Sequence, residues 1–247
     1  MTEQIPDVQS KFNKDYFSSG PYSGVSFNRY SQYWWSNRYY AMLVRKYGPQ
    51  SGKILELGCG LGHLLGWLVD KFDVYGADIN QWALSQASRN IPQGKFVLLA
   101  AENLHAFPDE VFQVVIAKHV VEHLPKPELA ISEISRVLTP GGLLLLVTPN
   151  TDSLARAVKK EDWIGYQDPT HISLWSPTKW IEQLHSNKLN PRKVFSDGFW
   201  DAPYFSWLPT SLQKLLFGAP GGLQAVFGWS FIPLRMGESM IVLAEKA

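Results

Sequence analysis

Three glycines separated by single residues follow the predicted strand Lys53–Leu57, in the order Gly58-Cys59-Gly60-Leu61-Gly62. Glycine at the end of a strand lets the backbone approach a bound ligand closely. The acid Glu56 precedes these glycines, and a second acid, Asp78, follows the next predicted strand. A carboxylate at that place can accept hydrogen bonds from both hydroxyls of a ribose. The spacing therefore indicates a site for a ligand that contains a nucleoside.

Two known glycine-rich motifs, the dinucleotide fingerprint and the Walker loop, do not match the spacing of this loop. A dinucleotide fingerprint, GxGxxG, would place its third glycine at position 63, which is His63. A phosphate-binding Walker loop would need Gly-Lys-Ser or Gly-Lys-Thr where the chain has Gly62-His63-Leu64. A tight turn between strand and helix would be enough to explain the three glycines, but it would not explain the acids Glu56 and Asp78.

Two histidines have positions suited to general-base chemistry. His119 comes at the end of a predicted strand, and His171 lies in the polar segment DWIGYQDPTHISLWSP, three residues after Asp168. The Ser176-Pro177 pair that follows is typical of a helix cap and first turn. Backbone hydrogen bonds alone would also account for either histidine, so both stay candidates for the base.

The segment His119-Val-Val-Glu122-His123 matches HxxEH, a pattern found in zinc peptidases. Two histidines four residues apart bind one metal only if the segment is helical throughout. Here His119 follows a strand, while Pro125 and Pro127 leave room for a short turn at most. We therefore expect no metal at this segment.

The elements that must position these residues follow from hydrophobic periodicity. Short apolar runs alternate with helical patterns such as HLLGWLVDKF and PELAISEISRVL. This order predicts a doubly wound α/β fold with a mostly parallel sheet, whose ligands bind at the carboxyl ends of the strands. The predicted strands are Lys53–Leu57, Asp73–Ala77, Lys95–Leu99, Phe112–Ala117 and Leu143–Thr148, with a sixth near Lys193–Ser196 and a closing strand at Met240–Ala244.

With these residues in this order, the chain resembles the class I S-adenosylmethionine-dependent methyltransferases of the bacterial small-molecule type, over about residues 50 to 150. LELGCGLGHLL is similar to their first motif, VYGADIN to the acidic loop after the second strand, and AENLHAF through LLLLVTPN to the rest of the fold core. The resemblance implies a Rossmann-like methyltransferase fold, with S-adenosylmethionine as cofactor and S-adenosylhomocysteine as product.

The resemblance also implies roles for particular residues. The glycines would line the methionine end of the cofactor, and Glu56 would hold the loop or reach the amino group. Asp78 would bind the ribose, and the backbone at Lys118 and His119 would close over the sulfonium. The family often has an acid where this chain has Ala100, so adenine recognition rests on Glu102 or on backbone groups. The implied cofactor contacts are Glu56, Gly58, Gly60, Gly62, Asp78, Ile79, Ala101, Glu102 and Lys118.

Methyl transfer from a sulfonium is an in-line displacement, so the protein must align donor and acceptor and remove any proton that the acceptor carries. We expect an enzyme that methylates an O or N atom of a small or medium-sized acceptor, such as a sugar, a quinone-like ring or a lipid-linked intermediate. Two alternatives stay open: a zinc-dependent hydrolase that uses the HxxEH segment, and a partner subunit that binds the cofactor without turnover.

Ring-bearing sequence flanks the central region on both sides. Residues 1–50 are predicted to form a lid or cap, and residues 51–247 the methyltransferase domain, with acceptor-side insertions near 151–176 and 199–236. The second insertion is apolar enough to line a pocket, form a homodimer contact or rest peripherally on a membrane, with the membrane the least expected of the three. The predicted acceptor contacts are Tyr30 and Tyr33 in the lid and Tyr166 and Asp168 in the first insertion.

Composition bears on the class of acceptor and on the cellular location of the protein. The formal net charge is only +1, so we expect a small-molecule acceptor rather than nucleic acid. The single cysteine, Cys59, and an N-terminus without an apolar leader predict a cytoplasmic protein. The uncharged stretch from Leu215 to Leu234 contains 4 glycines and 2 prolines, which argues against a continuous spanning helix and stable insertion in a bilayer.

Overall fold

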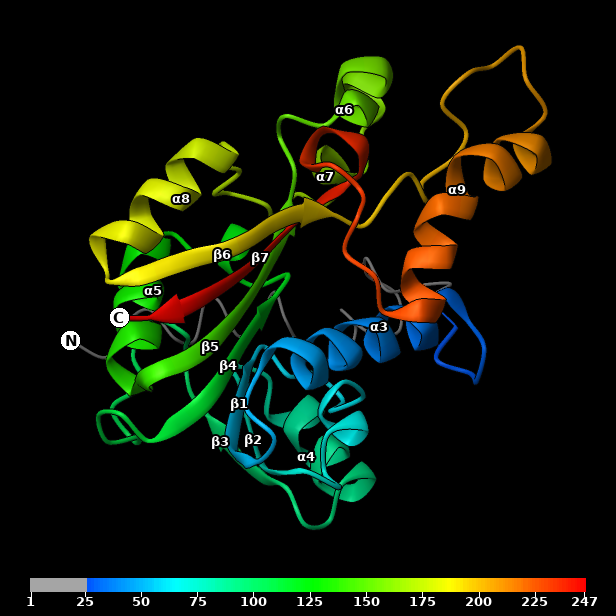
Figure 1. The fold of residues 1–247 in the computed structure, drawn as a ribbon. Coiled ribbons are helices and arrows are strands. Elements are labelled where there is room, and N and C mark those ends of the chain that lie inside the picture. The colour runs from blue at the N-terminus through cyan, green and yellow to red at the C-terminus, as the bar shows by residue number, and fades with distance from the viewer. Residues whose placement is uncertain (1–25) are drawn as a thin grey trace.

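A computed structural model describes residues 26–247 and shows a seven-stranded sheet in the order β3-β2-β1-β4-β5-β7-β6 (Figure 1). Strand β7 runs antiparallel to both of its neighbours, and the other pairings are parallel. The predicted doubly wound, mostly parallel sheet is therefore confirmed. The strands are β1 Gly52–Leu57, β2 Phe72–Asp78, β3 Lys95–Leu98, β4 Phe112–Lys118, β5 Leu138–Pro149, β6 Leu189–Ser196 and β7 Ser239–Lys246.

Helices cover both faces of the sheet because its central strands are apolar on both sides. In β5, Leu144 and Leu146 pack with α5 (Pro127–Val137) and α8 (Pro177–Ser186). The alternate residues of β5 pack with helices on the opposite face, α3 (Gln32–Tyr47) and α4 (Gln81–Asn90). Ser176 caps α8 by accepting a hydrogen bond from the backbone of Lys179, as the sequence predicts.

Helix α3 belongs to the core, although it lies within the predicted lid. Tyr39, Tyr40, Leu43 and Val44 are buried in the same apolar cluster as β1 and β5. Its first turns instead face the edge of the sheet where β1 and β4 end. Residues 1–25 of the predicted lid, with Tyr16, Phe17 and Tyr22, lie outside the described residues.

The segment after the glycine loop differs from the sequence prediction. HLLGWLVDKF was expected to be helical, but it forms turns around one short 3-10 helix, η1 (Leu65–Trp67). Gly62 and Gly66 have low helix propensity, and the backbone instead makes mixed bonds such as Gly66 N to Gly62 O and Trp67 N to Leu64 O. This geometry buries Leu64 and Leu65 while the Trp67 ring remains partly exposed.

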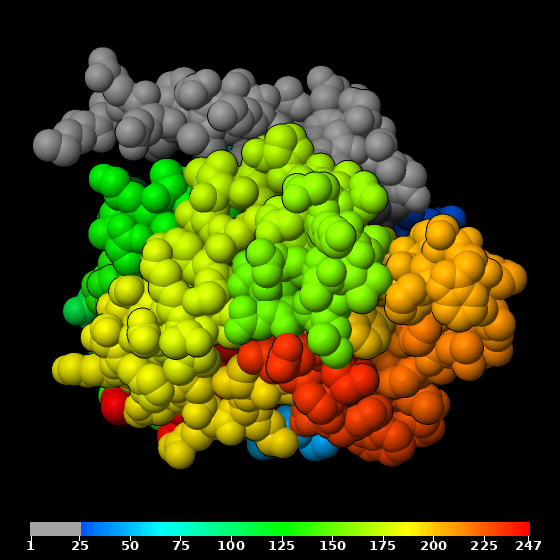
Figure 2. All heavy atoms as spheres, turned by 90° about the horizontal axis from the view of Figure 1, so that it is seen from above, coloured from blue at the N-terminus to red at the C-terminus, as the bar shows by residue number. Residues whose placement is uncertain are grey.

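Two insertions leave the sheet at the edge where β1, β2 and β4 end, because β6 runs in the same direction as β5. The first contains α6 (Leu154–Lys159), η3 (Lys160–Asp162) and α7 (Ile164–Gln167). The second contains α9 (Thr210–Phe227) and η4 (Leu234–Met236), and it forms one outer flank of the molecule (Figure 2).

The glycines and prolines of the second insertion do not prevent a helix at α9. This helix continues for 18 residues through Gly218 and Pro220. Gly221 explains why the helix lies so close to the end of β6, since a Cβ there would come within 2.6 Å of the Asp197 carbonyl oxygen. Over residues 26–247, no helix has the length and apolar character needed to cross a bilayer.

Candidate functional site

The glycine loop and Asp78 form one hydrogen-bonded unit at the ends of β1 and β2. Asp78 Oδ2 accepts from the Gly60 backbone at 2.8 Å, and Oδ1 accepts from the Asn80 backbone at 2.8 Å. Burial raises the pKa of Asp78, although these backbone donors oppose the rise. Gly58 has φ 62°, and a Cβ there would meet Val120 at 2.4 Å. The loop therefore requires glycine, and the carboxylate holds it in place.

Glu56 and Lys118 bring opposite charges together beneath α3. Burial raises the pKa of Glu56, and the charge of Lys118 opposes this rise. Burial likewise lowers the pKa of Lys118, and the charge of Glu56 opposes this fall. Lys118 Nζ donates to Asn37 Oδ1 at 2.9 Å and lies 5.2 Å from the Tyr33 ring. Within the described residues, Glu56 Oε2 and Asn37 Nδ2 are buried without a hydrogen-bond partner.

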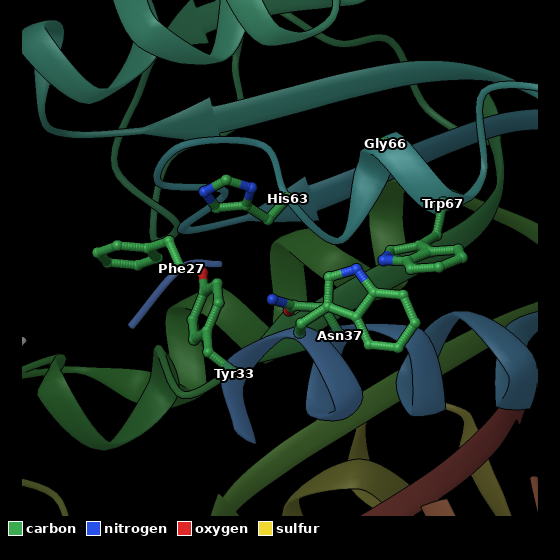
Figure 3. A pocket seen from close by; sticks show the side chains of 7 residues that line it. Phe27, Tyr33, Asn37, His63, Gly66 and Trp67 are labelled. Carbon is green, nitrogen blue, oxygen red and sulfur yellow. The ribbon is translucent and has the colours of Figure 1, made fainter. Parts of the chain in front are cut away.

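A cavity of about 320 Å³ lies between the start of α3 and the segment that follows the glycine loop. In Figure 3, the rings of Phe27, Tyr33 and His63 gather at one end, and Asn37 lies between them and Trp67. The cavity does not extend to Asp78. Its lining residues are Phe27, Tyr33, Trp34, Asn37, His63, Gly66 and Trp67.

The two candidate bases converge on one buried carboxylate. His119 Nδ1 lies 3.1 Å from Glu122 Oε1, and Glu122 lies with His123 and His171 in a group whose ligand atoms are all within 4.8 Å. Burial pushes the pKa of Glu122 upward, but the hydrogen bond and the charge of His119 hold it below its ordinary value. Glu122 therefore supplies negative charge beside the histidines.

The HxxEH segment is not a continuous helix. His119 has φ 52°, and only Val121–His123 form a short 3-10 helix, η2. The two histidines of the motif therefore do not lie one helical turn apart, as the zinc pattern requires. The described residues that do bring potential ligand atoms together are Glu122, His123 and His171, without His119.

Comparison with known families decides the identity of this fold. The sequence profile of a family described as methyltransferase domain matches residues 27–194. The chain belongs to the class I S-adenosylmethionine-dependent methyltransferases. The resemblance seen in the sequence is thereby confirmed, and the match includes α3, which the sequence assigned to a lid.

Individual relatives are named for methyl transfer to different acceptors. A malonyl-[acyl-carrier protein] O-methyltransferase of Methylococcus capsulatus is 28% identical over 57% of this chain, and the match spans 52% of that protein. A phosphatidylethanolamine N-methyltransferase of Cereibacter sphaeroides is 32% identical over 60% of this chain and 78% of its own length. This methyltransferase thus spans about half the length of the first relative.

Solved structures support the fold alone. A SAM-dependent methyltransferase from Archaeoglobus fulgidus superposes with a TM-score of 0.59 at 19% identity. The superposition covers 85% of this methyltransferase and 94% of that chain.

The remaining predicted cofactor residues of the methyltransferase follow β2 and β3. Ile79 directly follows Asp78, and its backbone lowers the pKa of that carboxyl through a hydrogen bond. Ala101 is buried just beyond β3. Glu102 is half-buried, and burial, aided by the charge of Glu128, raises its pKa. Ala101 and Glu102 follow β3, which pairs with β2, the strand that ends at Asp78.

The predicted acceptor residues are divided among different surroundings. Tyr33 lines the cavity, whereas Tyr30 is 62% exposed and packs against Trp34. Tyr166 accepts a hydrogen bond from Arg156 at 2.7 Å. Asp168 lies closer to the histidine group. Its Oδ1 accepts from the backbone and the hydroxyl of Thr170, which lies 2.9 Å from His123 Nδ1.

The sequence did not predict three features of the candidate site. Lys118 was assigned through its backbone, although a lysine at the end of an apolar strand signals a cation held at the site. Glu122 was considered only as part of a metal pattern, although it lies three residues after His119. Asn37 gave no signal, because its contact with Lys118 joins residues 81 apart.

A buried carboxylate joins the two insertions of the methyltransferase. Glu238 accepts hydrogen bonds from Trp163 Nε1 at 2.8 Å and from the Tyr204 hydroxyl at 2.6 Å. Burial raises its pKa to about 7, although both hydrogen bonds oppose the rise. The folded state therefore keeps a proton that the unfolded chain releases near pH 4.5.

We expect Glu238→Gln to flatten the pH dependence of stability. The contribution of Glu238 is fully present below about pH 4.5 and is lost as the pH rises through about 7. Each pKa unit is worth about 1.4 kcal/mol, so the wild type should lose about 3 kcal/mol across this window and the variant much less. Thermal unfolding at pH 5 and pH 8 measures the difference. An equal loss in both proteins would show that another group is responsible.

Proposed function

We propose that this chain transfers the methyl group of S-adenosylmethionine to an oxygen or nitrogen of a small or medium-sized acceptor, with His119 as the general base. The observation that carries this proposal is the pair His119 and Glu122, at the edge of the sheet that also holds the glycine loop and Asp78. When bound, the cofactor supplies an electrophilic methyl group on a sulfonium.

The orphaned polar atoms beneath α3 fit the amino-acid end of this cofactor. Glu56 Oε2 is a buried acceptor without a partner in the described part of the chain, and Asn37 Nδ2 is a buried donor in the same state. An α-ammonium group would satisfy the first, and an α-carboxylate would satisfy the second together with Lys118 Nζ. Asp78 would accept from the ribose hydroxyls, and the loop glycines would leave room for the backbone to approach.

His119 has the arrangement that a general base needs. Glu122 fixes its ring through Nδ1 and stabilises the imidazolium that forms when the other nitrogen, Nε2, takes a proton from the acceptor. His171 is fixed in a similar way, because its Nδ1 lies 2.7 Å from the Gly165 carbonyl oxygen. The carboxylate partner favours His119 as the base and leaves His171 for contact with the acceptor.

Replacing Lys118 by methionine should weaken S-adenosylhomocysteine binding by about tenfold or more, because a charge-assisted hydrogen bond to the carboxylate is lost. Calorimetric titration measures this loss. The nucleoside 5′-methylthioadenosine lacks the amino-acid end, so its affinity should not change. Lys95→Met, on the exposed start of β3, is the matched control. Equal weakening for both nucleosides would contradict the assignment of Lys118.

The names of the relatives do not fix the size or the chemistry of the acceptor. One relative is named for an O-methyl transfer to malonyl-[acyl-carrier protein], and another for an N-methyl transfer to phosphatidylethanolamine. The chain carries a net charge of only +1, which favours recognition by shape and apolar contact. A cytoplasmic location and a homodimer stay predictions from the sequence.

Transfer of a labelled methyl group tests the activity itself. The protein is incubated with methyl-labelled S-adenosylmethionine and a small-molecule extract of the cells that encode it. We expect label in one or a few small compounds and an equal amount of S-adenosylhomocysteine. Cofactor binding without transfer to any fraction would instead assign this chain the role of a non-catalytic partner subunit.

A further inference from the structure

Helix α9 carries its apolar residues on the outside. Their spacing of 3, 4, 11, 14 and 15 residues from Leu212 places them on one stripe of the helix. All are exposed, Leu215 to 66%, whereas the fully buried residues of this helix are Gln213 and Gln224. We call this stripe the α9 face, and it consists of Leu212, Leu215, Leu216, Leu223, Val226 and Phe227.

The buried Gln213 fixes an aromatic loop beside the start of the α9 face. Its Oε1 accepts from the backbone of Tyr204 and Phe205, and its Nε2 donates to the carbonyl oxygens of Phe205 and Leu208, at 2.6 to 3.0 Å. The amide is therefore fully hydrogen-bonded inside the protein. The loop that it holds presents Trp207, which is 76% exposed.

The buried Gln224 does the same at the other end of α9. Its Oε1 accepts from Phe231 at 2.9 Å and Ile232 at 3.0 Å, and its Nε2 donates to the Ser196 carbonyl oxygen at 2.7 Å. The turn that it holds exposes Trp229 and Phe231. The hydrogen-bonded amides of Gln213 and Gln224 thus hold the segments on either side of the α9 face in place. An exposed apolar surface of this kind is typical of a site that contacts another apolar surface.

Within the segment 202–236, which carries the α9 face, the charged side chains have one sign. Between residues 202 and 236 the ionisable side chains other than tyrosine are Lys214 and Arg235, with no acid. Three more cations bond to backbone or hydroxyl oxygens of this segment, and none of the five forms an ion pair with any described residue. The three are Arg38, Lys46 and Lys193.

We propose that the α9 face rests on the surface of a bilayer that contains anionic lipid. Exposed leucines would enter the boundary between headgroups and acyl chains, tryptophans would lie at the headgroup level, and the cations would attract the lipid phosphates. A second copy of this chain fits less well, because a two-fold contact would bring the same unpaired cations together.

The bilayer contact would lie beside the methyltransferase site. Arg38 Nη1 donates to the Val226 carbonyl oxygen at 3.0 Å, and the Tyr39 hydroxyl donates to the Trp229 carbonyl oxygen at 2.8 Å, so α9 is joined to α3. The first turns of α3 line the cavity through Tyr33 and Asn37. If the proposed methyl transfer holds, this placement presents the site to an acceptor that is carried by the membrane.

Co-sedimentation with vesicles tests the bilayer contact. The full chain should pellet with vesicles of phosphatidylcholine and phosphatidylglycerol, and less with phosphatidylcholine alone. The double variant Leu215→Ser/Leu216→Ser should bind at least about tenfold more weakly, because two side chains lose their apolar contact. Lys214→Glu should weaken binding only to the anionic vesicles. Leu129→Ser on α5 is the matched control, since Leu129 is 45% exposed on the other side of the sheet.

Titration with S-adenosylhomocysteine, without vesicles, checks that each variant is folded and tests cofactor binding separately from the membrane contact. The proposal is overturned if the wild type does not bind anionic vesicles, or if the double variant binds them as well as the wild type. It is also overturned if light scattering shows a dimer that the double variant converts to a monomer while vesicles stay unbound. That result would assign the α9 face to a second copy.

Discussion

Replacing His119 by alanine should lower the rate of methyl transfer by about 10²- to 10⁴-fold, the range typical of a lost general base. His119 lies at the end of β4, and Glu122 fixes its ring at 3.1 Å. Affinity for S-adenosylmethionine should change little, because the proposed cofactor contacts come from the glycine loop, Asp78 and Lys118. The rate of S-adenosylhomocysteine formation with a saturating acceptor, compared with a calorimetric titration, separates the two effects.

Two further variants sharpen the test of His119. Glu122→Gln should lower the rate by a smaller factor, because the ring keeps a hydrogen-bond partner but loses the negative charge. His185→Ala, on the exposed end of α8, should have no effect and is the matched control. Full activity of the His119→Ala variant would show that His119 is not the base and would leave His171 as the candidate. Activity that is lost with EDTA and restored by a divalent metal would assign Glu122 and His123 to a metal instead.

Replacing Asp78 by asparagine should weaken binding of S-adenosylhomocysteine by about 100-fold. Hydrogen bonds to a charged group are worth about 1.5–3 kcal/mol each, and this carboxylate would accept from the ribose as well as from the loop. The two carboxylate oxygens of Asp78 accept from the backbone of Gly60 and Asn80, whereas asparagine has only one acceptor oxygen. The glycine loop would therefore also lose one of these hydrogen bonds.

Controls for Asp78 come from the same strand and from the ligand. Asp73→Asn changes an exposed carboxylate near the start of β2, so the affinity should not change. Unlike Lys118→Met, the Asp78 variant should lose affinity for 5′-methylthioadenosine as well, because that nucleoside keeps the ribose. An affinity for S-adenosylhomocysteine that matches the wild type would remove Asp78 from the site.

Local patterns were sufficient to predict the sheet and the glycine loop. Strands β1, β2 and β4 are short, mainly apolar runs, and Glu56 and Asp78 fall at the carboxyl ends of β1 and β2. The helix expected after Gly62 did not form, because two glycines and the burial of neighbouring leucines favoured a 3-10 turn. The glycines and prolines after Leu215 did not predict helix α9, which continues through Pro220 and lies close to the Asp197 carbonyl oxygen at Gly221.

The convergence of His171 with Glu122 could not be predicted from spacing. Glu122 follows β4, whereas His171 comes after β5 and a further insertion, so only the folded topology brings them together. The pairing of Lys118 with Asn37 has the same origin, since α3 crosses the end of β4 in space but precedes β1 in sequence. Sites assembled from separate crossovers depend on such contacts, which periodicity does not encode.

A crystal structure of this chain with S-adenosylhomocysteine tests the central claim most directly. We predict that the ribose hydroxyls lie at the Asp78 carboxylate and that the amino-acid end lies between Glu56 and Lys118, with the sulfur facing His119. A ligand bound elsewhere, such as between Leu129 and Arg136 on α5, or no binding at all, would contradict the account.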